Sequence, residues 1–166
     1  MTTWFTGDEH FTHANIIKYC KRPFASVEEM NAAIIERHNA RVKDGDVVYH
    51  LGDFVFKNTV KGYAAKLNGS HIFIRGNHDK DRLSGILEIT IEKQRIVLCH
   101  YAMRVWNASH YGAWQLYGHS HGTLPPIGKQ YDVGVDNNNF APISFEELRE
   151  KLKDVPIHNP IKREEK

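Results

Sequence analysis

The sequence predicts an α/β protein in which helices cover a mixed β-sheet. Strand-like segments and amphipathic helical segments follow one another along a chain of 166 residues, which is the pattern of layered α/β folds. Several strand-like segments, such as DVVYHL at 46–51 and RIVLC at 95–99, are almost uninterrupted apolar runs, as expected for strands covered on both faces. No repeat or linker interrupts the chain. We therefore expect one domain over residues 1–153 and a partly disordered tail over residues 154–166.

The chain is expected to open with a strand and to continue into a well-capped helix. The strand is TTWFT at residues 2–6. Ser26 and Glu29 have the spacing of a capping box, in which the serine side chain and the glutamate side chain satisfy each other's backbone amides. The turn signal KDGD at 43–46 ends this helix. Its apolar stripe consists of Val27, Met30 and Ile34.

Two further helices are expected later in the chain. Asn58 caps the first of them, and Asn68 with Gly69 ends it. Ser144 and Glu147 repeat the capping box at the start of the second. Their inward-facing residues are Val60, Ala64 and Leu67 in the first and Phe145, Leu148 and Leu152 in the second.

The remaining strands lie between these helices. The segment ILEITIE alternates apolar and polar residues and is expected to turn at Lys93 into QRIVLCH, which makes the two segments a β-hairpin. The mixture of strands and helices predicts a sheet that contains both parallel and antiparallel pairs. The expected strands are residues 46–51, 71–75, 86–92, 94–100, 114–118 and 131–136.

The composition excludes several classes of protein. A net charge of +2 gives no support to tight, processive binding of nucleic acid. The two cysteines, Cys20 and Cys99, do not form a CxxC pair, so no zinc-ribbon or thioredoxin-like motif is present. The first residues lack the basic and apolar regions of a signal peptide, and no apolar run is long enough to span a bilayer. We therefore expect a cytoplasmic protein.

Polar residues follow the strands in an unusual pattern. Five strands end in Asp, Asn or His, within the segments GDEH, GD, GNHD, a single His and GHSH. Ligands of open α/β sheets bind outside the carboxyl ends of the strands, so these side chains are expected to converge on one pocket. Residues two apart in an extended segment share a face, which places His119 beside His121 and Asp8 beside His10. The converging residues are Asp8, His10, Asp53, Asn77, His78, His100, His119 and His121.

The donor set predicts two metal ions. Without His78, the set offers seven nitrogen and oxygen donors and no thiolate, which is more than one ion needs. Two neighbouring sites that share a carboxylate would use all seven. Such mixtures suit Mn, Fe, Zn, Co or Ni rather than Ca, and we expect Mn first. Two metals about 3.5–4 Å apart are the apparatus of hydrolytic phosphoryl transfer.

The ordered set DEH, GD, GNHD, H and GHSH resembles the calcineurin-like metallophosphoesterases, and it spans most of the chain from Asp8 to His121. The short chain and its segments YHLGDF and LYGHSHG resemble the compact members of the family found in bacteria and phages. The resemblance implies a four-layer α-β-β-α sandwich with mixed sheets. It also implies a hydroxide between two metals as the nucleophile and His78 as the general acid. Its implied ligands are Asp8, His10 and His121 for the first metal, Asn77, His100 and His119 for the second, and Asp53 as the bridge.

One branch of the family differs from this chain. Protein Ser/Thr phosphatases carry GDxxDRG at the bridging carboxylate, whereas this chain has GDFVFKN with Phe56 at the second Asp position. The carboxylate that orients the catalytic histidine in that branch is therefore missing, and so is the arginine that follows it. This departure counts against a protein phosphatase and leaves the residue that orients His78 unassigned.

Other polar residues near these segments are weaker candidates. His13 and His110 lie close to the motif blocks, and either could touch substrate at the rim or serve only the local structure. Arg75 could reach a phosphate, although the end of a buried strand also suits a structural residue. Asp79 is expected to bond local backbone, and Asp136 is a candidate brace for the GHSH loop.

The remaining histidines and aromatic residues have mainly structural interpretations. His50 could support the site from behind, although packing in the core is the simpler reading. Trp106, Tyr111 and Trp114 could stack a base, but aromatic clusters are more often core. The histidines expected at the surface are His38, His71 and His158.

These observations favour a dinuclear metal-dependent phosphoesterase that prefers phosphodiesters. A chain of this length has little room for a cap domain, so the site is expected to be open to phosphate esters, with nucleotides and short nucleic acids among the candidates. The alternative is a catalytically weak metal-binding scaffold for protein–protein contacts, because the retromer scaffold subunit resembles this fold. Here all seven ligands and His78 are present, which disfavours the scaffold. The sequence does not fix the oligomeric state.

Overall fold

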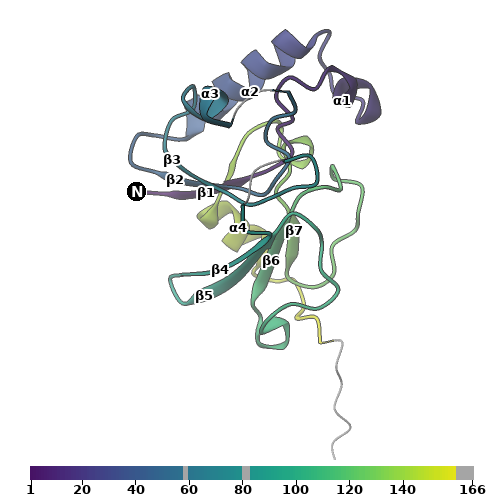
Figure 1. Cartoon of the computed structure of the whole chain (residues 1–166). Coiled ribbons are helices and arrows are strands. Elements are labelled where there is room, and N and C mark those ends of the chain that lie inside the picture. Colours follow the sequence, from purple (N-terminus) through teal and green to yellow (C-terminus); the bar gives the residue numbers. More distant parts are fainter. Residues whose placement is uncertain (58–59, 80–82, 160–166) are drawn as a thin grey trace, which may run out of the picture.

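Two four-stranded β-sheets pack face to face in this protein (Figure 1). The computed structural model describes residues 1–57, 60–79 and 83–159. Both sheets combine parallel and antiparallel pairs, and helices lie outside them, so the expected α/β class with mixed sheets is confirmed. The capping residue Asn58 and residues 160–166 of the expected tail lie outside the described residues. Within the described part, no helix has the length and apolar character that crossing a membrane requires.

The first sheet has the strand order β3-β2-β1-β8. Strands β1 (Thr3–Thr6), β2 (Val47–His50) and β3 (Ser70–Phe73) run parallel, and β8 (Ile143–Ser144) joins β1 antiparallel. The carboxyl ends of the three parallel strands therefore meet at one edge of the sheet, and each continues into one of the polar segments of the sequence.

The second sheet has the strand order β4-β5-β6-β7. The predicted hairpin is confirmed, because β4 (Ile86–Ile91) and β5 (Gln94–Cys99) pair antiparallel in register from Ile86 with Cys99 to Ile91 with Gln94. Strands β6 (Trp114–Tyr117) and β7 (Gln130–Asp132) continue the sheet parallel to β5. The expected strand at 131–136 ends earlier, at Asp132, because residues 135–137 form a 3₁₀ turn.

The main core lies between the sheets. Phe5 and Leu51 from the first sheet meet Leu98 and Leu116 from the second, and all four are fully buried. Helix α4 (Phe145–Leu152) adds its apolar stripe to the same cluster. The expected capping box at its start is confirmed.

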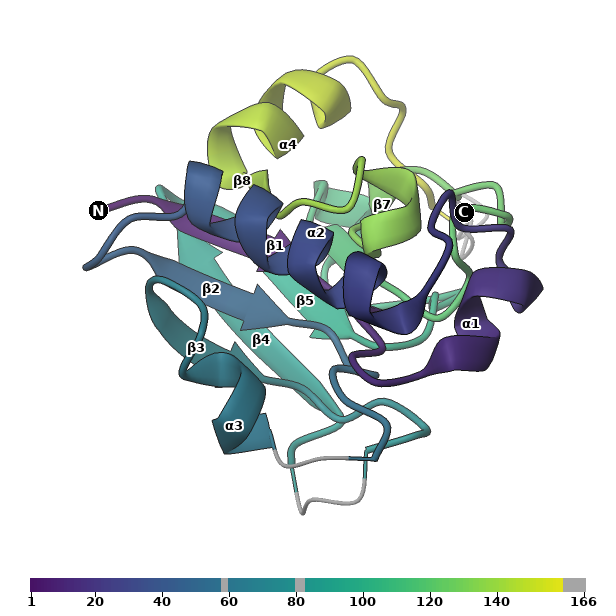
Figure 2. The same cartoon turned by 90° about the horizontal axis from the view of Figure 1, so that it is seen from above.

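Helices α2 (Val27–Arg41) and α3 (Val60–Ala64) cover the outer face of the first sheet, and α1 (Ala14–Tyr19) lies beside them beyond the strand ends (Figure 2). Helix α2 begins at the expected cap, where the Ser26 side chain accepts the amide of Glu29. Helix α3 is shorter than expected, because residues 65–69 form turns. Helix α1 was not predicted: it has six residues and no side-chain cap.

The outer face of the second sheet is covered by a loop that contains the 3₁₀ turn η1 (Ser109–Tyr111). Trp106 and Ala113 of this loop pack on Val97 of β5. The core interpretation is therefore right for Trp106, but it is wrong for Tyr111, which is 82% exposed.

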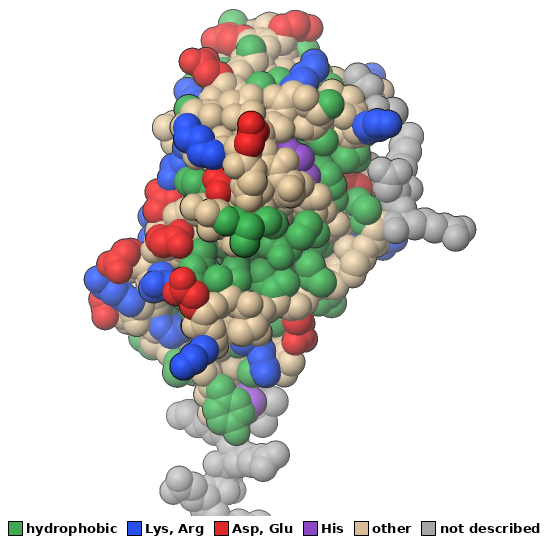
Figure 3. Space-filling model, turned by 90° about the vertical axis from the view of Figure 1, so that its left-hand side faces the viewer, with side chains coloured by type: hydrophobic (Ala, Val, Ile, Leu, Met, Phe, Trp, Pro, Cys, Tyr) green, Lys and Arg blue, Asp and Glu red, His purple; other side chains and the backbone are tan. Residues whose placement is uncertain are grey.

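One side of the sandwich remains open where the edge strands β3 and β4 lie. Figure 3 shows hydrophobic side chains gathered on this side of the molecule. Ile72 of β3 is exposed, and Leu87 and Ile89 of β4 are half-buried against the main core. The closed side is the one where β8 and α4 complete the packing.

Candidate metal centre

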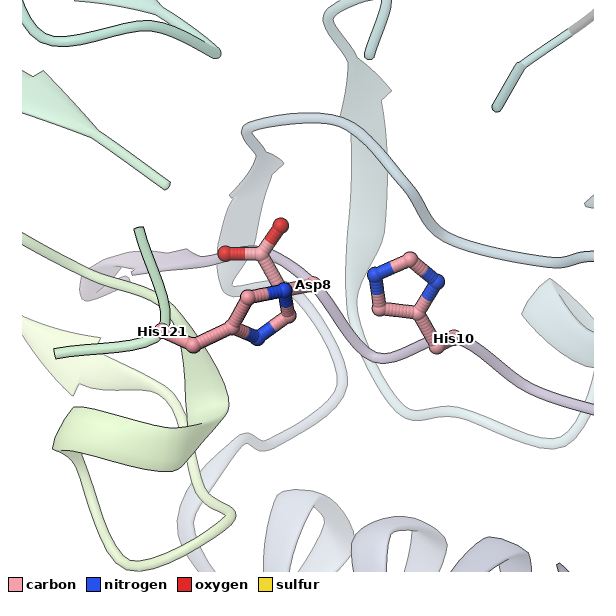
Figure 4. A group of neighbouring side chains, drawn as sticks. All are labelled: Asp8, His10 and His121. Carbon is pink, nitrogen blue, oxygen red and sulfur yellow. The ribbon is translucent and has the colours of Figure 1, made fainter. Parts of the chain in front are cut away.

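The polar segments after β1, β2, β3, β5 and β6 meet at one end of the two sheets. Two groups made only of histidine and carboxylate side chains have ligand atoms close enough to share an ion: Asp8, His10 and His121 form one, and Asp53, His100 and His119 form the other. Figure 4 shows the first group, in which Asp8 and His10 follow β1 and His121 comes from the loop after β6.

Asp53 connects the two groups. Its Oδ2 atom lies 3.6 Å from His10 Nε2 and 3.5 Å from His100 Nε2. Asn77 belongs to the second group, since its Oδ1 atom lies 3.0 Å from His100 Nε2. The structure therefore brings all seven sequence-predicted ligands into one cluster, with a carboxylate between its halves.

The backbone of this cluster is held in an uncommon conformation. The left-handed region of φ is rarely used by residues other than glycine and concentrates at functional sites. Hydrogen bonds between the loops hold it here, including Asp8 N to Gly52 O at 3.0 Å and His10 N to Asp53 O at 2.9 Å. The residues concerned are Asp8, His10, Asp53, His119 and His121, with φ values of 57°, 51°, 56°, 65° and 46°.

Glycines let the ligands approach the backbone. A Cβ atom added to Gly118 or Gly134 would lie 2.7 Å from Asp8 Oδ2, and one added to Gly76 would lie 2.2 Å from Asp53 Oδ1. Neither carboxylate can reach its position beside a larger residue, so the glycines of GNHD and GHSH are required by packing.

Replacing Gly76 with alanine is expected to displace Asp53 and to lower metal content. The added methyl group would also lie 2.5 Å from Asp53 N, and overpacking of this kind costs roughly 1–3 kcal/mol. Metal analysis and urea unfolding measure the two effects. Gly85→Ala is the matched control, because a Cβ there meets nothing within 4 Å. Equal behaviour of the two variants would contradict the role given to Gly76.

Two of the histidines, His100 and His121, hold Nδ1 against an acceptor, which leaves Nε2 for an ion. His100 Nδ1 lies 2.8 Å from the carbonyl of Leu51, which can only accept, so Nδ1 donates and Nε2 keeps its lone pair. His121 Nδ1 similarly lies 2.8 Å from Asp136 Oδ2. Histidine ligands of metals usually donate their other ring nitrogen in this way. The expected bracing of the GHSH loop by Asp136 is present.

A buried arginine joins the two loops of the first group. Arg22 donates to Asp136 from Nε at 2.8 Å and from Nη2 at 2.7 Å. It also donates to the carbonyls of Asp8 at 2.7 Å and Glu9 at 3.1 Å. Arg22 therefore links the DEH segment to the aspartate that orients His121. This role of Arg22 could not be predicted from the sequence, because no local pattern marks an arginine 114 residues from its partner.

A second buried network supports the DEH segment from the side of α2. His50 Nδ1 lies 2.6 Å from Glu9 Oε1, and His50 Nε2 lies 3.0 Å from His71 Nδ1. His50 thus carries a polar network within the core. His38, which also packs on His50, is 2% exposed, so its expected surface position is wrong: the ring is covered while Nε2 bonds the carbonyl of Asn68 at 3.0 Å.

Asp79 bonds local backbone, as expected. Its Oδ2 atom accepts the amides of Gly76 at 2.7 Å and Asp53 at 2.9 Å. The Asp79 carboxylate thereby links the GNHD loop to the GD loop and fixes the backbone at Asp53.

The unpartnered atoms of the cluster fit a cation. Asp8 Oδ1 and His10 Nε2 are buried without a hydrogen-bond partner. Burial and the nearby carboxylates Asp132 and Asp53 raise the pKa of Asp8 well above its ordinary value. Burial lowers the pKa of His10 to about 3, so its ring is neutral at neutral pH. A buried lone pair beside crowded carboxylates is the environment that a divalent ion stabilises.

Buried neutral histidines make the metal-free protein sensitive to acid. Burial lowers the pKa of His10 to about 3 and that of His38 to about 4 from 6.5. Between these values the unfolded chain binds more protons, so the free energy of unfolding decreases as pH falls from about 6.5, by at most about 1.4 kcal/mol per unit for each ring. Urea unfolding with a chelator at several pH values measures this slope. His38→Gln keeps a donor for Asn68 and should flatten the slope; an unchanged slope would contradict the assignment.

His78 is exposed beside the cluster, with 41% of its side chain accessible. Its amide donates to Asp53 Oδ1 at 2.9 Å, and its Nε2 lies 4.0 Å from Asp53 Oδ2. Ring edges surround it: His10 at 5.5 Å, Phe56 at 5.9 Å and His13 at 6.0 Å between centroids. Phe56 thus stands beside His78 where protein phosphatases have a carboxylate.

The three weaker candidates lie in different places. His13 is buried against Phe56, with 4.1 Å between ring centroids, and it faces both His10 and His78. Arg75 is exposed beside Asn77. His110 lies in η1 against Tyr111, near Gly112, whose carbonyl bonds Gln94 at the start of β5. His100 follows the other end of β5, so His110 is not brought to the cluster.

Two packed mixed sheets with a histidine and carboxylate centre at the strand ends define the metallophosphoesterase class of α/β proteins. The calcineurin-like phosphoesterase superfamily domain matches residues 2–130, and the chain belongs to this family. The chain is 36% identical to the uncharacterized protein MJ1445 of Methanocaldococcus jannaschii, over 95% of this chain and 97% of that one. Its fold is similar to a crystal structure of the protein of unknown function AQ665 from Aquifex aeolicus, with a TM-score of 0.74, 24% identity, and coverage of 90% and 98%.

Proposed function

We propose that this protein is a dinuclear metal-dependent phosphoesterase with a preference for phosphodiesters. Membership of the calcineurin-like phosphoesterase family supports hydrolysis of phosphate esters. The observation that carries the finer proposal is the pair of ligand groups on either side of Asp53, whose Oδ2 atom lies 3.5–3.6 Å from a histidine of each. Manganese is the first candidate metal, because nitrogen and oxygen donors without thiolate suit it.

The ligands divide between two ions. When bound, two divalent ions would lower the pKa of a shared water from 15.7 toward about 7 and neutralise charge on the phosphate. Burial by itself raises the pKa of the shared carboxylate of Asp53, but hydrogen bonding, including the bond from the His78 amide, outweighs burial and lowers the pKa to about 2. It is therefore an anion at neutral pH. The assigned ligands are Asp8, His10 and His121 for one ion and Asn77, His100 and His119 for the other, with Asp53 common to both.

The other residues bind substrate and move the proton. His78 Nε2 lies 4.0 Å from Asp53 Oδ2 and its side chain is 41% exposed, and in this proposal it gives a proton to the leaving oxygen. His13 stands beside it and offers a second imidazole to the phosphate. Arg75 lines the same pocket as Asn77, and in this proposal it contacts the ester group. The distant position of His110 gives no support to a substrate contact.

The experiment that tests the proposal uses matched nitrophenyl phosphomonoester and phosphodiester substrates. The protein is stripped with a chelator and supplied in turn with Mn, Ni, Co, Zn or Mg. We expect metal-dependent hydrolysis that is faster for the diester. Two bound equivalents without turnover of either substrate would favour the scaffold alternative, and the complete set of ligands together with His78 argues against that outcome.

A further inference from the structure

A pocket with a volume of about 500 Å³ opens next to the second ligand group. Its wall includes Asn77, so the pocket begins where the proposed phosphate site ends. Binding sites for small molecules commonly have volumes of about 300–1,000 Å³. The pocket is therefore large enough for the organic part of an ester whose phosphate lies at the metal centre.

Tyr101 lines this pocket and also contacts two histidines of the second ligand group. Its ring lies 5.0 Å from the His100 ring and 4.8 Å from the His119 ring, measured between centroids. The residue is 46% exposed and lines the pocket together with Ile86 and Cys99. This wall is aromatic and apolar, which suits a flat ring rather than a sugar or a further phosphate.

Arg75 supplies the one cation that lines the pocket within residues 1–57, 60–79 and 83–159. No carboxylate or carbonyl of these residues pairs with its guanidinium. The carboxylate of Asp79, which also lines the pocket, is bound to the amides of Gly76 and Asp53. The guanidinium of Arg75 is thus free to donate to the acceptor oxygens of a ligand.

We propose that this pocket binds the nucleoside part of a phosphate ester, with the base on Tyr101 and acceptor oxygens on Arg75. The proposal rests on the proposed function, because the ester phosphate must lie at the metal centre beside Asn77. A plain alkyl ester would leave Arg75 without a partner, and a sugar phosphate would leave the wall of Tyr101 and Ile86 uncovered. A nucleoside offers a base to Tyr101 and Ile86 and acceptor oxygens to Arg75.

The test is calorimetric binding to the full-length, manganese-loaded protein, so it does not depend on turnover. The probes are adenosine 5′-monophosphate, ribose 5-phosphate and inorganic phosphate. Stacking of a base on an aromatic side chain is worth about 1–3 kcal/mol, so the nucleotide should bind roughly 5- to 150-fold more tightly than ribose 5-phosphate. In Tyr101→Ala this ratio should fall to about one, while the affinity for inorganic phosphate stays unchanged.

Three controls separate recognition from structural damage. Tyr101→Phe keeps the ring and should keep the ratio, and Tyr111→Ala removes an 82% exposed tyrosine on η1 and should change nothing. Arg75→Gln should weaken the nucleotide more than phosphate, whereas Arg95→Gln, an exposed arginine in β5, should not. Metal content is measured for each variant.

Two results would overturn the proposal: equal binding of the nucleotide and ribose 5-phosphate by the unchanged protein, or a ratio that survives in Tyr101→Ala. Loss of hydrolysis with every ester would instead contradict the proposed function. Because the binding ratio is measured without turnover, the two failures are distinguishable.

Discussion

Replacing Asp53 with alanine is expected to remove both metal ions and to reduce hydrolysis to the uncatalysed background. The Oδ2 atom of Asp53 lies 3.6 Å from His10 Nε2 and 3.5 Å from His100 Nε2, so its loss opens both ligand groups at once. Without it, the second group has no carboxylate and the first keeps only that of Asp8, so the remaining ligands cannot balance two dications. Metal analysis after dialysis should find far less than two equivalents.

Two further variants make this result specific. Asp53→Asn keeps an oxygen for the His78 amide, which donates to Asp53 Oδ1 at 2.9 Å, but it removes the charge; it should lose metal while the fold is kept. Asp44→Ala removes an exposed carboxylate from the turn before β2 and should change neither metal content nor activity. Two equivalents of metal in Asp53→Ala would refute a shared carboxylate.

Replacing His78 with alanine is expected to slow hydrolysis by roughly 10²–10⁴, the usual contribution of general acid catalysis. The His78 side chain is 41% exposed and none of the ligand groups includes it, so the metal content should be unchanged. The loss should be large for an ester with an alkoxide leaving group and small for a nitrophenyl ester, since a good leaving group needs little protonation. Steady-state rates on the two esters measure this difference.

His110→Ala is the matched control for His78, because His110 is exposed and lies at the far end of β5. It should retain full activity on both esters. An equal loss in His78→Ala for good and poor leaving groups would argue that the ring positions substrate and does not supply a proton. Loss of metal in that variant would place His78 among the ligands.

The features that local sequence determines were predictable. The caps at Ser26 and Ser144 depend on residues three positions away, and both are present. The turn at Lys93 is set by the two segments beside it, and it forms the expected hairpin. Helix α1 was missed because the His13 side chain makes no cap and its six residues carry no periodic signal. The division into two sheets was expected only from the family resemblance and is present, because pairing between distant strands leaves no local trace in the sequence.

The positions of the candidate ligand residues could also be predicted from local sequence, but the residues that hold them in place could not. Each ligand directly follows a recognisable strand, so its position at the sheet edge follows from the strand itself. Arg22 and Asp136 meet only because the whole chain folds, and the same holds for Glu9 and His50 across 41 residues. The surface position predicted for His38 was also wrong. Its ring belongs to a mostly polar helix, but it can be buried because its Nε2 forms a hydrogen bond with the carbonyl of Asn68.

The origin of the ligands in both sheets has a consequence for the kinetics of the protein. Asp8 and His10 follow a strand of the first sheet and His121 a strand of the second, while Asp53 and His100 divide in the same way. Neither sheet alone holds a complete set, so an ion bound by both would join one half of the sandwich to the other. Such a link would form only after the two halves have docked, so it would slow unfolding without speeding folding. On the proposed function, the supply of metal would then affect the lifetime of the folded protein more than its folding rate.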